Sequence, residues 1–219
     1  MSPLERYFKL PKEKRDRLVA AARAEFAAHG FERASYNRII EAADVSKGAM
    51  YYYFIDKADL FGEVIDQLMV ELVSQVGPLR QAQDADDFWA ALWEWMMAAT
   101  RAVLSSPDFA ALGHCLYQDG GPHGAVTRLR EQLHAVATET LEYGQKLGAV
   151  RKDVPTEMLA VGLTHMLIGL DRWFTERFEQ MEPSEVEHLS SKTLELCRDL
   201  ASPKPVAKAA AQPKRRKRQ

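Results

Sequence analysis

The segment ASYNRIIEAADVSKGAMYYYFIDKADLF, residues 34–61, contains two short helix patterns joined by a tight turn. Ser35 and Ser46 are suitable N-caps, because a serine hydroxyl accepts a hydrogen bond from an N–H group in the first helical turn. Asp44 lies between the two helices and tolerates the unusual backbone angles of a turn. The two short helices and a longer preceding helix form a helix-turn-helix unit. We expect these helices at residues 13–29, 35–43 and 47–54.

The second short helix carries an outward face suited to DNA. Residues four apart share a face of a helix, so Lys47 lies beside Tyr51, and Gly48 beside Tyr52. The lysine can meet a phosphate, the glycine lets the backbone approach one closely, and the tyrosine hydroxyls can donate to phosphate oxygens. The alternative for the tyrosines is a place at the edge of the core, which we favour only for Tyr53. The face predicts binding to double-stranded DNA.

Residues 12–61 resemble the TetR family of bacterial transcriptional regulators, in which a helix-turn-helix is followed by a pattern close to V-S-K-G-x-x-Y-x-Y-F-x-x-K-x-x-L-F. This chain reads VSKGAMYYYFIDKADLF over residues 45–61. The resemblance implies a repressor that binds an operator, with Arg38 as an additional candidate contact. The DNA contacts that it implies are Ser35, Ser46, Lys47, Gly48, Ala49, Tyr51, Tyr52 and Lys57.

Two positions depart from the family pattern. Asp44 stands where glycine is usual, and Ser35 with Tyr36 stands near the place of a usual threonine; both replacements are chemically serviceable. The side chain of Ala49 has no hydrogen-bonding group, so base reading there is limited to apolar contact. The operator sequence therefore does not follow from this helix.

Charge is strongly segregated along the chain, although the net charge is only −2. Residues 1–55 hold ten Lys/Arg against seven Asp/Glu, residues 56–199 hold twelve against twenty-four, and residues 200–219 hold seven and none. The three parts therefore carry +3, −12 and +7. Because DNA repels an acidic body, we expect nucleic-acid contact to be confined to the two basic ends.

Composition and motifs favour a helical protein without catalytic chemistry. Of the 219 residues 47% are hydrophobic, which is enough for a core, and no apolar run reaches the length of a membrane span. The N-terminus has no apolar signal core, so we expect a cytoplasmic protein. No nucleophile–base pair, phosphate-binding loop or metal-ligand spacing is visible. This argues against the rival interpretation as an all-helical enzyme, and we expect no cofactor or metal.

The remainder of the chain reads as helices separated by glycine and proline. We expect an all-α fold of about nine helices: a helix-turn-helix DNA-binding domain at residues 1–55, a helical effector-binding and dimerisation domain at 56–201, and a disordered basic tail at 202–219. The later helices are expected at residues 56–76, from 84 to just before 107, 107–117, from after 122 to 147, 155–181 and 183–201.

The helices at 155–181 and 183–201 suggest a homodimer. Small residues alternate with large apolar ones on the first of them, so a partner helix can approach closely. The family resemblance implies that the two helices pair across a twofold axis as a four-helix bundle. The alternative is that this apolar surplus is the core of the monomer. We expect the dimer, because two recognition helices about one DNA turn apart read a palindromic operator.

A cluster of Trp and Met residues at 88–97 is the candidate effector site. Aromatic and methionine side chains suit an adaptable apolar cavity, and the resemblance implies a small apolar or aromatic effector that releases the repressor from DNA. An ordinary core has the same composition, so this alternative stays open. The candidate lining residues are Trp89, Trp93, Met96, Met97, Phe109, His114, Tyr117, Met166, Trp173 and Phe174.

The basic tail has two interpretations. It is either a phosphate-binding arm that raises DNA affinity in a salt-dependent way or an inert solubilising end. The first interpretation also suits the alternative function, an effector-independent or nucleoid-associated DNA-binding protein.

Overall fold

The computed structural model describes residues 5–117 and 123–204, and its regular elements in these ranges are all helical. This confirms the all-α expectation. None of the described helices is both long and apolar enough to span a membrane. In order, the elements are α1 (Glu5–Phe8), α2 (Lys12–Arg33), α3 (Tyr36–Ala42), α4 (Lys47–Tyr53), α5 (Lys57–Val76), α6 (Ala85–Leu104), α7 (Pro107–Tyr117), α8 (His123–Lys146), α9 (Thr156–Thr175), the 3₁₀ helix η1 (Phe178–Gln180) and α10 (Pro183–Ala201).

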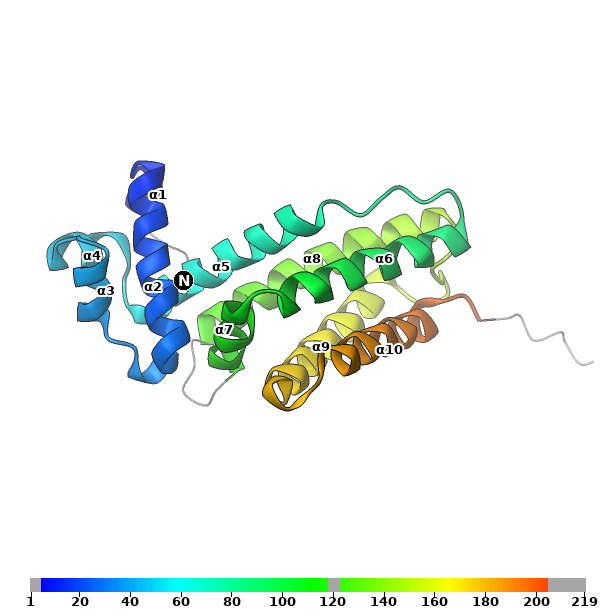
Figure 1. The fold of residues 1–219 in the computed structure, drawn as a ribbon. Helices are drawn as coiled ribbons and strands as arrows, with labels where there is room; N and C mark the ends of the chain where they lie inside the picture. The colour runs from blue at the N-terminus through cyan, green and yellow to red at the C-terminus, as the bar shows by residue number, and fades with distance from the viewer. Residues whose placement is uncertain (1–4, 118–122, 205–219) are drawn as a thin grey trace, which may run out of the picture.

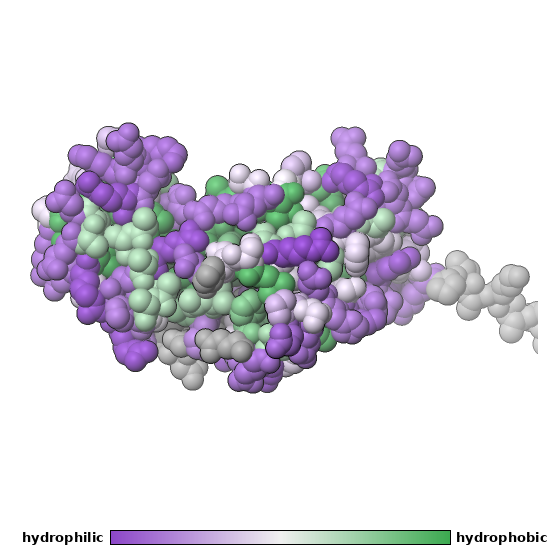
Figure 2. Space-filling view, viewed as in Figure 1, coloured by the Kyte–Doolittle hydropathy of each residue, from purple (hydrophilic) through white to green (hydrophobic). Residues whose placement is uncertain are grey.

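The molecule is elongated, with α3 and α4 at one end and the long helices α6, α8, α9 and α10 toward the other (Figure 1). The helix α5 connects the two parts. In the view of Figure 2 the end that carries α3 and α4 is largely hydrophilic, whereas hydrophobic residues gather near the middle of the molecule.

The expected caps of the helix-turn-helix are confirmed. The Ser35 hydroxyl accepts a hydrogen bond from the Arg38 N–H at 3.3 Å, and the Ser46 hydroxyl accepts one from the Ala49 N–H at 3.1 Å. Asp44 adopts a φ of 53°, in the left-handed region that aspartate tolerates better than most residues. Each cap satisfies an N–H group that has no partner within its helix.

The helix-turn-helix and the first half of α5 share one hydrophobic core. Phe26 of α2 packs edge-on against Phe61 of α5, with ring centroids 5.0 Å apart. The same core includes Leu112 of α7 and Leu129 of α8, so α5, α7 and α8 together support the helix-turn-helix. The largest fully buried contributors include Leu18, Phe26, Ile39, Met50, Phe54, Leu60 and Phe61.

A second core joins α6, α8, α9 and α10. Phe88 lies at its centre, with its ring 5.1 Å from that of Trp89 and 5.8 Å from that of Tyr143. The Tyr143 hydroxyl donates to the carbonyl of Ala82 at 3.1 Å, which holds the α5–α6 connection against α8.

Three helix boundaries differ from expectation. The short helix α1 was not expected at all, and α2 continues for one turn beyond Gly30, where the chain kinks with a φ of 71°. The helix α9 ends at Thr175 rather than at residue 181. There, the Thr175 hydroxyl donates to the Arg172 carbonyl at 2.9 Å and the Arg177 guanidinium donates to the Trp173 carbonyl at 3.2 Å. These side chains satisfy carbonyls of the last turn, so the helix can stop without a glycine or proline.

Candidate nucleic-acid interface

The helix α4 has one buried face and one exposed face. Met50 on α4 and Phe54 at its C-cap are fully buried in the helix-turn-helix core. On the opposite side Tyr51 and Tyr52 are 52% and 50% exposed, and Lys47 and Gly48 are exposed beside them. We call these four residues the α4 face. Large aromatic side chains held in solvent by a rigid helix are available for a partner.

Gly48 is the position on the α4 face where a partner group can approach the helix backbone most closely. A Cβ placed on Gly48 would meet no heavy atom of the described residues within 4 Å, apart from its own helix backbone and its chain neighbours, so the space above it is open. Ala49, the next residue, is half-buried. Its methyl group is short, so it reaches a base edge less easily than the longer side chains of α4.

The two predicted serine contacts act first as helix caps. Ser35 and Ser46 each use an oxygen lone pair for capping. A serine hydroxyl also carries one donor hydrogen. Capping and donation to a phosphate are therefore compatible, and DNA contact by these serines stays a prediction.

Arg38 is engaged within the protein. Its Nε donates to the Glu25 carboxylate at 2.9 Å, and its guanidinium also contacts the Arg33 carbonyl. The Arg38 guanidinium, helped by the Ser35 N–H, lowers the pKa of Glu25. Contact between Arg38 and DNA requires this ion pair to be shared or broken.

Lys57 is likewise bound inside the protein. Its ammonium group donates to the carbonyls of Glu32 and Ala34 at 3.0 and 3.2 Å and lies 4.8 Å from the centre of the Phe31 ring. Lys57 thus ties the start of α5 to the end of α2. This structural role was not foreseen, because the partners lie more than twenty residues earlier in the chain.

Two residues outside the predicted set adjoin the exposed tyrosines. The ring of Tyr36 lies 5.4 Å from that of Tyr51, and burial together with the Tyr51 charge raises the pKa of Tyr36. The Arg6 guanidinium lies 4.1 Å from the centre of the Tyr52 ring. The four-residue helix that carries Arg6 is too short to leave a periodic signal in the sequence.

The candidate effector residues with described side chains lie in several different environments. Trp89 is buried in the second core, with Met166 partly buried against it, whereas Phe109 packs on the helix-turn-helix core. Trp93 is 46% exposed and Trp173 is also exposed. Among the others Met97 is buried, Met96 and Phe174 are half-buried, His114 is exposed, and the side chain of Tyr117 lies outside the described part of the structure.

A groove of about 490 Å³ separates α6 from α10. Trp89 and Trp93 form its aromatic wall, and the Trp93 indole N–H donates to the Ser191 hydroxyl at 3.3 Å. The groove therefore combines two of the candidate residues with α10, which the sequence analysis did not include. The remaining lining residues are Asp86, Ala90, Glu94, Leu194, Glu195 and Arg198.

The expected tail contributes nothing to this description, because residues 205–219 lie outside the described part of the chain. Both interpretations of the tail therefore stay predictions.

Sequence comparison identifies similar proteins. A profile described as "Bacterial regulatory proteins, tetR family" matches residues 18–64, from α2 into α5. The chain is 30% identical over 167 residues to the HTH-type transcriptional repressor AcnR of Corynebacterium jeikeium, with 72% of this chain and 79% of that protein covered. A shorter match, 42% identical over 50 residues, covers 23% of this chain and 23% of the probable acrEF/envCD operon repressor of Escherichia coli.

Structural comparison extends over more of the chain. A TetR-family transcriptional regulator from Syntrophomonas wolfei superposes with a TM-score of 0.68, covering 86% of this chain and 96% of that one at 16% identity. NalD, described as the secondary repressor of the MexAB-OprM multidrug efflux pump in Pseudomonas aeruginosa, superposes with a TM-score of 0.60 at 19% identity, covering 87% and 97%. At such identities the likeness concerns the fold.

Proposed function

This chain belongs to the TetR family of bacterial transcriptional regulators and is a DNA-binding repressor, and from this premise we propose that the α4 face docks in the major groove of its operator. The observation that carries the proposal is the exposure of Tyr51 and Tyr52 on a helix whose opposite face is fully buried. Lys47 supplies a charge for a phosphate, and the tyrosine hydroxyls supply neutral donors. The capping serines at the starts of α3 and α4 complete the proposed contacts.

The direct test is a footprint on the region upstream of the protein's own coding sequence, followed by affinity measurements at several salt concentrations. We expect a palindromic protected site. The Lys47→Gln substitution should weaken binding to all duplexes alike and reduce the salt slope by about 1 per protomer. Lys146→Gln, at the end of α8, is the matched control and should leave both unchanged. Binding without any sequence preference would contradict the proposal.

We propose a homodimer that places two α4 helices on one operator. The support is a run of exposed apolar side chains on α9 and α10, where a Cβ added to Gly162 would lie 4.0 Å from a methyl carbon of Leu200. Val161 and Leu196 are exposed on the same two helices. Exposed apolar patches of this kind mark interaction surfaces, and twofold pairing matches a palindromic site.

We propose further that a small apolar or aromatic effector binds the α6–α10 groove and weakens operator binding. Trp93 offers a half-exposed aromatic surface there, and the groove is large enough for a small organic molecule. The helix α6 packs on α5, and α5 contributes Leu60 and Phe61 to the helix-turn-helix core. A shift of α6 would therefore change the separation of the recognition helices, provided that the effector binds the two arrangements unequally. Both proposals assign effector binding and dimerisation to residues 56–201.

The effector proposal is tested by screening apolar aromatic compounds for release of the operator. An active compound should fail on the Trp93→Ala variant, while that variant binds the operator as the wild type does. Since Trp93 is exposed, its replacement should leave the fold intact. If Trp93→Ala responds normally to every active compound, the effector binds elsewhere.

A further inference from the structure

The short helix α1 is anchored against the recognition helix. Tyr7 is buried, and its ring lies 5.0 Å from that of Phe54 at the C-cap of α4. Burial, together with the charge of the neighbouring Glu63, raises the pKa of Tyr7, so its hydroxyl stays neutral. The Tyr7 carbonyl accepts a hydrogen bond from the Leu10 N–H at 3.0 Å, which ends the helix. A four-residue helix has little stability alone, so this packing positions it.

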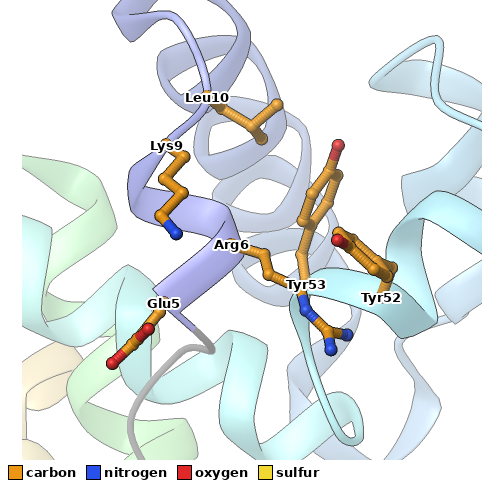
Figure 3. Close-up of a pocket in the computed structure, with 6 residues that line it drawn as sticks. All are labelled: Glu5, Arg6, Lys9, Leu10, Tyr52 and Tyr53. Atoms are coloured by element: carbon orange, nitrogen blue, oxygen red, sulfur yellow. The ribbon is translucent and has the colours of Figure 1, made fainter.

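The anchored helix and the residue after it present two cations beside the α4 face. The Arg6 guanidinium stacks over the Tyr52 ring at 4.1 Å from its centre, and Lys9 is exposed one turn later. Both residues line a groove of about 570 Å³ whose other wall is formed by Tyr52 and Tyr53. In Figure 3 Arg6 extends toward α4, whereas Glu5 points away from the two tyrosines.

These cations differ electrostatically from Arg38. Within the described residues no carboxylate lies within 4 Å of the charged group of Arg6 or Lys9, whereas Arg38 is paired with Glu25. An uncompensated cation retains its full attraction for an anion, while a paired one must first exchange partners. A guanidinium that stacks on an aromatic ring keeps its N–H groups at its edges, where they can donate hydrogen bonds in the plane of the guanidinium itself.

We propose that α1 and the residue after it form a second phosphate-binding element, in which Arg6 of α1 and Lys9 contact the DNA backbone next to the phosphates reached by the α4 face. This inference rests on the proposed docking of α4. Because the Arg6 guanidinium lies in direct contact with Tyr52, a duplex that reaches the Tyr52 hydroxyl brings its backbone close to Arg6. The family profile begins at residue 18, so α1 lies outside the part of the chain that the profile matches.

The test compares salt slopes of operator binding for Arg6→Gln, Lys9→Gln, Arg6→Lys and the wild type. Each neutralising substitution should reduce the slope by about 0.9 per protomer and lower the affinity near 0.1 M salt by roughly tenfold per lost phosphate contact. Arg6→Lys should keep the wild-type slope because it keeps the charge. The preference for operator over random duplex should stay unchanged, since phosphate contacts carry no sequence information.

Two controls separate the possible failures. Lys152→Gln, an exposed lysine between α8 and α9, should leave the slope unchanged. All variants should melt at the wild-type temperature, because Arg6 and Lys9 are exposed and the anchor Tyr7 is retained. An unchanged slope in Arg6→Gln and Lys9→Gln, with wild-type operator preference intact, would overturn the role of α1 alone. A wild-type protein without operator preference would overturn the proposed function and this inference with it.

Discussion

At Gly48 the requirements of the fold differ from those of the proposed DNA binding. Among the described residues outside the helix's own backbone, no heavy atom lies within 4 Å of a Cβ at this position, so a methyl group is tolerated by the monomer. In the proposed DNA complex the same methyl would occupy the space between the α4 backbone and the phosphate. We therefore infer that the partner, rather than the packing of the protein, favours glycine here.

We expect Gly48→Ala to leave the melting temperature unchanged or slightly raised, because alanine favours helices by up to about 1 kcal/mol. Operator affinity should fall by about tenfold through loss of one charge-assisted hydrogen bond. Thermal unfolding and fluorescence anisotropy on labelled duplex measure the two effects. Wild-type affinity in this variant would show that the α4 backbone does not approach a phosphate here.

Glu63 links pH to stability. It is buried on α5 beside α1, and burial raises its pKa, with the Asp66 charge adding to the shift and the Gln67 amide opposing it. The folded protein therefore binds a proton that the unfolded chain releases above its ordinary carboxyl pKa of 4.5. Stability consequently falls as pH rises from 4.5 through the raised pKa of the folded state.

Glu63→Gln removes this titration. We expect the variant to gain stability relative to the wild type as pH rises from about 4.5 to 7, with the smallest difference at the acid end. Urea unfolding at several pH values measures this difference, and Asp59, whose pKa is also raised by burial, is common to both proteins and cancels. A stability difference that stays constant across this range would contradict the argument.

At the scale of elements, the close packing of α8 against α6 depends on a glycine of α8. A Cβ at Gly144 would lie 2.5 Å from a methyl carbon of Val150 and 2.7 Å from the Phe88 ring. Both neighbours are buried, and the ring is rigid. The close approach of α8 to α6 therefore requires the absence of a side chain at this position.

We expect Gly144→Ala to lower the free energy of unfolding by about 1–3 kcal/mol, the usual cost of overpacking a core. Gly48→Ala is the control, because it makes the same substitution in a helix with open space around it. Denaturant unfolding of both variants is the measurement. Equal stability of the two would mean that Val150 and Phe88 move aside without loss.

At the scale of the whole molecule, the proposed operator complex contains two copies of the chain. The exposed apolar run on α9 and α10 lies on helices remote from α4 (Figure 1). A substitution there can abolish operator binding only through assembly. The helices proposed to hold the dimer and the helix proposed to contact DNA are thus separable by mutation.

We expect Val161→Asp to yield monomers and to weaken operator binding by more than about 100-fold, since a buried unpaired carboxylate is strongly unfavourable. Val70→Asp, at a more exposed valine on α5, should stay dimeric. Sedimentation equilibrium and operator affinity provide the readouts. A dimeric Val161→Asp protein would show that the twofold interface lies elsewhere.

Much of the helix-turn-helix follows from short-range chemistry. Ser35 and Ser46 cap their helices through residues three positions later, and Asp44 turns the chain with its own backbone angles. Interactions over three or four residues can be predicted from the sequence because one helical turn contains both partners. The burial of Met50 and Phe54 follows from the same periodicity.

Long-range contacts could not be predicted from the sequence in the same way. Lys57 binds carbonyls at the end of α2, and Arg38 pairs with Glu25 across the helix-turn-helix. The Trp and Met cluster was treated as one site, yet Trp89 and Trp93 line the α6–α10 groove, whereas Met97 on the same helix is buried. Composition does not distinguish these environments, because burial depends on which neighbouring helix covers each side chain.

The order of amino acids was thus sufficient to indicate an all-α regulator with a DNA-binding face on Lys47, Gly48, Tyr51 and Tyr52, because caps and helical periodicity act over a single turn. Only the folded chain brings Arg6 onto Tyr52 and commits Lys57 to the end of α2. These pairings join residues more than twenty positions apart, and they form because packing of the cores places those residues side by side.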